Sequence, residues 1–220
     1  MLTEKATQEE LRHYVRLSYQ LGRLPKTMRL RYQRAKVHQE PYFVYRTTIP
    51  GTDQPVLIIR YVLVDIFSPI LIVQGREGDG YAYRAKNGYT IIESHAIRRY
   101  FNRHEHMNEN EVKTLADIDP DILKRVVNKM LYDMDGANTY SDSLGTTQDC
   151  YYEGGVFRVN EIDGVAHFWT YVMNSQAFPD QRMRSLKSEK RYKTLKAKMA
   201  DKEYLKTAAN IETALMLHGL

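Results

Sequence analysis

The spacing of hydrophobic and polar residues changes twice along the chain. Over residues 7–37 apolar side chains recur every three or four positions, which predicts one or two helices, with an interruption at Gly22 and Pro25. From Tyr42 the pattern becomes typical of β-strands, and from Pro179 onward it is again helical. This order of elements predicts an α+β fold in which helices flank and pack on a sheet.

The central part of the chain predicts a sheet of short strands rich in Val, Ile and Tyr. Turn residues separate these strands at Pro50-Gly51, at Ser68-Pro69, in the Gly75–Gly80 loop and at Asn87-Gly88, and Asn-Gly is a strong signal for a type I′ hairpin. Five strands in succession imply an antiparallel meander. The predicted strands are Tyr42–Ile49, Val56–Phe67, Ile70–Gln74, Tyr81–Ala85 and Tyr89–Ile92.

A final hairpin turns at Asp163-Gly164, another type I′ signal. Its register places Val159 across from Phe168, facing the core, and Arg158 across from Trp169 on the other face. The second pair could be a cation–π contact or a platform for base stacking. The strands of this hairpin are Gly155–Asn160 and Val165–Val172, and they follow a predicted helix over Pro120–Met134 and a predicted loop over Gly136–Gln148.

The most distinctive stretch is a short basic helix that begins after the strand ending at Ile92. Ser94 stands where an N-cap would be, and at about 100° per residue the helix has an apolar arc and a polar arc. The polar arc carries guanidiniums, imidazoles and an amide, groups that can hold a phosphodiester and move a proton. The apolar arc holds Ala96, Ile97, Tyr100 and Phe101; the polar arc holds His95, Arg98, Arg99, Asn102 and His106, with Arg103 at its margin. The alternative is a solvated face on a surface helix.

Charge is segregated along the chain. Residues 1–40 contain 9 Lys and Arg against 4 Asp and Glu, residues 41–181 contain 13 against 19, and residues 182–220 contain 10 against 4. Basic ends around an acidic centre suggest an anionic partner, with nucleic acid ahead of a membrane surface; the alternative is that the charges keep surface helices soluble. Within the N-terminal segment, Arg29, Arg31 and Arg34 alternate with Met28, Leu30 and Tyr32, which makes this arm the best N-terminal candidate for phosphate contacts.

Several function classes find no support in the sequence. The chain has no apolar run long enough for a membrane span, and its first residues lack the apolar core of a signal peptide, so we expect a cytoplasmic protein. The single cysteine, Cys150, fits a reducing compartment and reads as a structural thiol. His104 and His106 would point about 200° apart on a helix, so we expect no metal site, and no motif calls for a cofactor.

The pattern Ser94-His95-Ala96-x-x-Arg99-Tyr100-x-x-Arg103, followed by an acidic linker, a helix and a hairpin that reaches Thr170, resembles small RelE-like and barnase-like bacterial ribonuclease domains of the toxin type. It is also similar to phage- or plasmid-type proteins with a His-x-x-x-Arg-Tyr-x-x-Arg helix. The resemblance covers roughly residues 88–172. The chain departs from that plan through its extra strands and basic helix before the His-bearing helix and its two long helices after the last strand.

The resemblance implies metal-independent cleavage of RNA. In that reading His95 transfers the proton, Arg99 and Arg103 bind the phosphate, Arg98 supports them, and Thr170 supplies a hydroxyl contact. Asn102, His106 and Arg158 complete the candidate substrate-binding residues.

The competing hypothesis is a non-enzymatic structural or binding component of a phage or mobile element, which contacts nucleic acid or another protein subunit through its basic ends and its many tyrosines. The sequence divides the chain into a basic helical extension over residues 1–40, a core domain over 41–178 and basic helices over 179–220. We expect residues 42–172 to fold without the two ends, because they contain every predicted strand.

Overall fold

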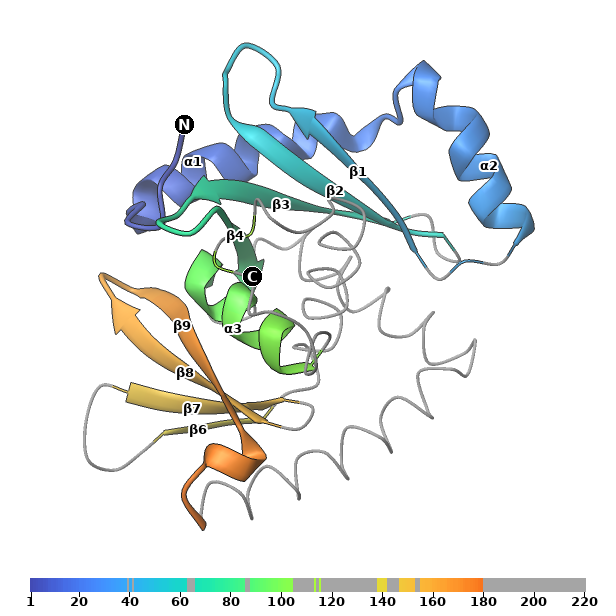
Figure 1. Ribbon diagram of the computed structural model, residues 1–220. Helices are drawn as coiled ribbons and strands as arrows, with labels where there is room; N and C mark the ends of the chain where they lie inside the picture. Colours follow the sequence, from blue (N-terminus) through green and yellow to red (C-terminus); the bar gives the residue numbers. More distant parts are fainter. Residues whose placement is uncertain are drawn as a thin grey trace.

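The computed structural model describes residues 1–38, 40, 42–62, 66–85, 88–104, 113, 115, 138–141, 147–152 and 155–179. In these residues the protein has an α+β architecture in which a nine-stranded sheet carries helices on both faces (Figure 1). The helices are α1 (Gln8–Ser18), α2 (Arg29–Val37) and α3 (Ser94–His104), and short 3-10 turns at Tyr19–Gly22 and Lys26–Met28 connect α1 to α2.

The sheet consists of two antiparallel halves joined by one parallel pair. The strand order is β1-β2-β3-β4-β5-β9-β8-β7-β6, and β5 runs parallel to β9 with Tyr89 opposite Val165. The expected antiparallel sheet is therefore correct within each half and wrong at their junction, since a chain that leaves β5 through a helix can return in the same direction. The strands are β1 (Tyr42–Thr48), β2 (Pro55–Tyr61), β3 (Ile66–Gln74), β4 (Asp79–Ala85), β5 (Gly88–Ile92), β6 (Asn138–Ser141), β7 (Thr147–Tyr152), β8 (Gly155–Ile162) and β9 (Val165–Met173).

The predicted break at Ser68-Pro69 is wrong, because β3 runs through both residues and the division from β2 comes before Ile66. Pro69 lies opposite Ile58 of β2, whereas the pairing of β3 with β4 begins only at Leu71. A proline lacks the N–H that a strand with two partners would use. At Pro69 the strand pairs on one side, so the ring is accommodated.

The predicted loop over Gly136–Gln148 is also wrong in part, because Asn138–Ser141 forms β6 at the end of the sheet. Thr139 pairs with Cys150 of β7. Thr139 and Tyr140 favour strands, whereas the Asn and Ser that flank them do not, so the pairing with β7 is needed to explain this short strand.

The turn of the last hairpin is confirmed, because both Asp163 and Gly164 have positive φ angles, of 50° and 75°. Val159 lies opposite Phe168 as expected, and both side chains are buried. Arg158, however, lies opposite Thr170 and not opposite Trp169, because the register shifts between Arg158 and Val159. A bulge places one extra residue in β9, which sequence periodicity does not reveal.

One face of the sheet packs on α3, which lies between the two halves of the sheet in Figure 1. Ala96, Ile97, Tyr100 and Phe101 are all buried, which confirms the predicted apolar arc. The ring of Tyr100 lies 5.2 Å from that of Tyr171 on β9 and 6.0 Å from that of Phe157 on β8. These contacts fix the orientation of α3, so its polar arc faces away from the sheet.

The other face of the β1–β5 half packs on residues from the N-terminal segment, including α1 and α2 (Figure 1). Leu11 and Val15 of α1 and Tyr32 of α2 are buried in the same cluster as Val56 and Leu71. Residues 2–4 also extend the sheet, since the Gln74 N–H donates to the Leu2 carbonyl and the Glu4 N–H donates to the Gln74 carbonyl. Residues 1–40 thus contribute to the core, which argues against the prediction that residues 42–172 fold without the two ends.

We expect the Leu11→Ala variant to lose about 2–5 kcal/mol of unfolding free energy, because it removes a side chain that is 0% exposed. The matched control is Leu30→Ala on α2, where the side chain is 77% exposed and the expected change is below about 0.5 kcal/mol. Urea titrations followed by circular dichroism measure both. If both variants lose equally little unfolding free energy, the packing of α1 on the sheet does not contribute to stability.

The helix predicted over Pro120–Met134 and the helices predicted after Pro179 lie outside the described residues. None of the helices in the described part combines the length and apolarity needed to cross a bilayer.

Candidate functional site

The N-terminus of α3 is held by a residue from the start of the chain. The Ile97 N–H donates to the Glu93 carbonyl at 3.2 Å, so Ser94 is the first residue of the helix and not its predicted N-cap. The Ser94 N–H donates to the Glu4 carboxylate, which satisfies one of the free amides at the helix start. A side chain at Gly75 would overlap both Glu4 and Ser94, so this close approach depends on glycine.

His95 and Arg98 converge on Glu77, which lies in the turn between β3 and β4. The Glu77 Oε1 atom is 3.0 Å from Nδ1 of His95, and the Nε atom of Arg98 donates to Glu77 Oε2 at 2.6 Å. The Arg98 side chain is 11% exposed, whereas that of His95 is 33% exposed. Glu77 therefore neutralises Arg98 and orients an imidazole that solvent can still reach.

The backbone of Glu77 is fixed on both sides. Its N–H donates to Ser94 Oγ at 3.2 Å, and its carbonyl accepts from the Leu115 N–H at 2.8 Å. The next residue, Gly78, has a φ of +134°, and a side chain there would strike Leu115. The sequence predicts only a turn at Gly75–Gly80 and does not indicate a role for Glu77, because the contact of Glu77 with His95 on α3 spans 18 residues.

A carboxylate beside one nitrogen of an imidazole fixes the tautomer of the ring. When Nδ1–H donates to Glu77, the Nε2 atom carries the free lone pair and can accept a proton. Nε2 of His95 has no hydrogen-bond partner within the described part of the chain. The pair thus has the geometry of a general base with a positioning carboxylate.

Glu4 and Glu77, which both contact the start of α3, have opposite pKa shifts. Burial alone would raise the pKa of Glu77, but hydrogen bonds from Arg98 and His95 hold it below the ordinary value. Burial raises the pKa of Glu4, against the hydrogen bonds from Ser94. Of these two carboxyl groups, Glu77 is the one that stays ionised more readily.

Arg99 lies one helical turn after His95, on the same face of α3. Its Nε atom is buried, and its guanidinium makes no hydrogen bond or ion pair with any of the described residues. A partly buried cation without a partner is unfavourable unless an anion binds to it. Arg99 is therefore the strongest candidate for binding an anionic ligand near His95.

The other predicted residues of α3 are less free. The Arg103 guanidinium donates to the Tyr171 carbonyl, so it ties the end of α3 to β9. Asn102 is half-buried on the same helix and has contacts of its own. His106 lies outside the described residues.

The structure does not bring Arg158 and Thr170 to α3. Their neighbours Phe157 and Tyr171 pack on Tyr100, and successive strand residues point to opposite faces. Arg158 and Thr170 lie opposite each other on the far face, where the Nε atom of Arg158 is 3.6 Å from Asp149 Oδ1. A ligand at His95 would not reach them.

A second imidazole–carboxylate pair joins β9 to the residue that precedes α3. Nδ1 of His167 is 3.3 Å from Glu93 Oε1, but the His167 side chain is only 5% exposed. Substrate cannot reach a buried ring, which favours His95 as the residue able to act on a ligand. No group of three His, Cys, Asp or Glu side chains within the described ranges is arranged to hold a metal ion.

We expect the Glu77→Gln variant to be less stable than the parent by about 1–2 kcal/mol at pH 7, because Arg98 loses its charged partner. A carboxyl group with a lowered folded pKa contributes stability above its unfolded pKa and loses it as the pH falls. The difference between the two proteins should therefore shrink below about pH 4.5, the ordinary value. Thermal melts from pH 3 to pH 8 measure it.

The control for this series is Asp79→Asn, in the same hairpin. Asp79 pairs with Arg46 on the surface, where the two side chains are 34% and 53% exposed, so its loss should cost less than about 1 kcal/mol. A stability difference for Glu77→Gln that does not change with pH would contradict the ionised state of Glu77.

Comparisons of this chain with protein-family models, with curated proteins and with solved structures found no match.

Proposed function

We propose that this protein cleaves RNA without a metal ion, with His95 as the general base and Arg99 as the phosphate-binding residue. One observation carries the proposal: a partly exposed imidazole oriented by a carboxylate lies one helical turn from a guanidinium that has no partner among the described residues. Proton transfer and charge stabilisation are the two requirements for breaking a phosphodiester by its own 2′-hydroxyl.

The reaction follows from these roles. Nε2 of His95 takes the proton of the 2′-hydroxyl, the 2′ oxygen forms a bond to the adjacent phosphorus, and the bond from phosphorus to the 5′ oxygen breaks. The 5′ oxygen takes a proton from water, and the products are a 2′,3′-cyclic phosphate and a free 5′-hydroxyl. Arg99 stabilises the negative charge that builds up on the phosphorane oxygens. Glu77 keeps the imidazole in the required tautomer as a positioning residue.

The second candidate is binding of nucleic acid without cleavage. It rests on a different observation, the basic face of α2, where Arg31 and Arg34 lie exposed and without carboxylate partners in the part of the chain that the structure describes. The two functions predict different products from the same incubation.

The test is an incubation of the full-length protein with a mixed-sequence RNA carrying a 5′ label, in EDTA, from pH 5 to pH 8. Cleavage is expected to leave fragments that end in a 2′,3′-cyclic phosphate, and DNA of the same sequence should remain intact because it lacks the 2′-hydroxyl. RNA that stays intact at every pH, while still binding, would replace the ribonuclease proposal by the binding one.

A further inference from the structure

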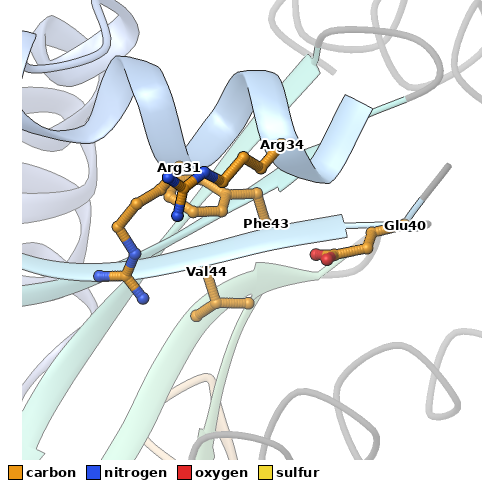
Figure 2. Close-up of a pocket in the computed structure, with 5 residues that line it drawn as sticks. All are labelled: Arg31, Arg34, Glu40, Phe43 and Val44. Atoms are coloured by element: carbon orange, nitrogen blue, oxygen red, sulfur yellow. The ribbon is translucent and has the colours of Figure 1, made fainter. Parts of the chain in front are cut away.

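A pocket of about 320 Å³ lies between α2 and the edge strand β1, far from the His95 cluster. It is lined by Arg31 and Arg34 of α2, by Phe43 and Val44 of β1, and by Glu40. Figure 2 shows Arg31 reaching from the helix to the strand, Arg34 lying along the helix beside Phe43, and Glu40 at the opposite end. Its volume is at the lower end of the range of small-molecule sites.

The charge of this pocket is set by α2. The helix sequence RLRYQRAKV contains four basic residues and no acidic one, and only Tyr32 and Ala35 are buried in the core. The Arg31 guanidinium carbon lies 6.0 Å from the centroid of the Phe43 ring, a cation–π contact that orients the group and leaves its N–H donors free. Neither Arg31 nor Arg34 forms an ion pair with a described residue, although Glu40 lines the same pocket.

We infer that this pocket binds a phosphate ester, with Arg31 and Arg34 donating to its oxygens. Two guanidiniums on one side of a pocket match the planar, bidentate recognition of phosphate. Phe43 is 7% exposed, so it forms the wall of the pocket and does not offer an open face for stacking. The ligand is therefore recognised through its phosphate, as in a polynucleotide backbone or a free nucleotide.

The pocket is a second site, separate from the proposed cleavage. The start of β1 at Tyr42 pairs with Tyr61 of β2, and Tyr61 pairs with Ile66 at the start of β3. The pocket therefore lies near the start of β3. The turn that carries Glu77 follows the opposite end of β3, at Gln74. A strand of nine residues spans roughly 25–30 Å. An RNA held in this pocket must therefore run over several nucleotides to reach His95.

The test uses full-length protein carrying His95→Ala, so that the RNA remains uncleaved and the result does not depend on the proposed activity. Arg31→Gln combined with Arg34→Gln is compared with Arg12→Gln combined with Arg16→Gln, which removes the same charge from exposed positions of α1. Fluorescence anisotropy measures the binding of a labelled 12-nucleotide RNA and, in a separate arm, of a labelled adenosine mononucleotide, over a range of salt concentrations.

We expect the pocket variant to lose about tenfold or more in affinity, and its slope of log K against log salt to become shallower by about 1.4, because each phosphate contact on a single strand contributes about 0.7. The control should lose at most about threefold. A loss in the RNA arm identifies a strand as the ligand, and a loss only in the mononucleotide arm identifies a free nucleotide. Equal losses in pocket variant and control, or no binding by the parent in either arm, would overturn the inference.

Discussion

Replacing His95 with Ala is expected to reduce RNA cleavage by about 10²–10⁴-fold, the usual effect of removing a proton-transfer residue. The RNA affinity should hardly change, because the imidazole is assigned to proton transfer and not to phosphate binding. The melting temperature should also change little, since the His95–Glu77 pair is 33% and 21% exposed and such pairs contribute about 0–1 kcal/mol. Single-turnover cleavage, anisotropy and thermal melts measure these three quantities.

The matched control is His13→Ala, an exposed histidine on α1. It should cleave RNA at the parental rate. A His95→Ala variant that retains full activity would remove this residue from the mechanism. If the melting temperature and the activity of His95→Ala both fall strongly, the ring has a structural role.

Replacing Arg99 with Ala is expected to lower cleavage by about 10²–10³-fold, as is usual when a group that stabilises transition-state charge is lost. RNA affinity should also fall, because the same guanidinium contacts the ground-state phosphate. Stability is the distinguishing measurement: Arg99 has no partner in the described part of the chain, so its removal orphans no other group. The melting temperature should stay constant or rise.

Arg99→Lys separates charge from geometry. A lysine keeps the positive charge and loses the planar fork, so it should restore binding more than cleavage. Arg12→Ala on α1 serves as the control for loss of one exposed positive charge. Activity and melting temperature that fall in parallel in Arg99→Ala would show that the residue supports the fold instead of the reaction.

The α3 helix could be predicted from the sequence because the pattern that specifies it lies within the helix itself. Ala96, Ile97, Tyr100 and Phe101 lie on one arc at a spacing that only a helix satisfies, and all four are buried. The strong turn signal Asp163-Gly164 was equally reliable, since a type I′ turn needs two residues that tolerate positive φ.

The features that escaped prediction depend on contacts between distant segments. Nothing near Glu77 in the chain indicates that its carboxylate meets His95, and nothing near Glu4 indicates that it binds the first amide of α3, 90 residues away. The bulge that pairs Arg158 with Thr170 is likewise a property of two strands together. Sequence periodicity identified the helix that carries the site and not the residues that complete it.

The parallel pairing of β5 with β9 also has a consequence for the order of events during synthesis. Tyr89 to Ile92 can complete the β1–β5 meander as soon as they leave the ribosome, yet their partners run from Val165 to Phe168. At about 5–20 residues per second, the roughly 75 residues between them take about 4–15 seconds to make. Throughout that interval β5 presents an unpaired edge, the kind of edge that recruits strands from other chains. Nascent chains stalled before residue 165 should therefore associate with one another or with a chaperone, whereas chains released after Met173 should not.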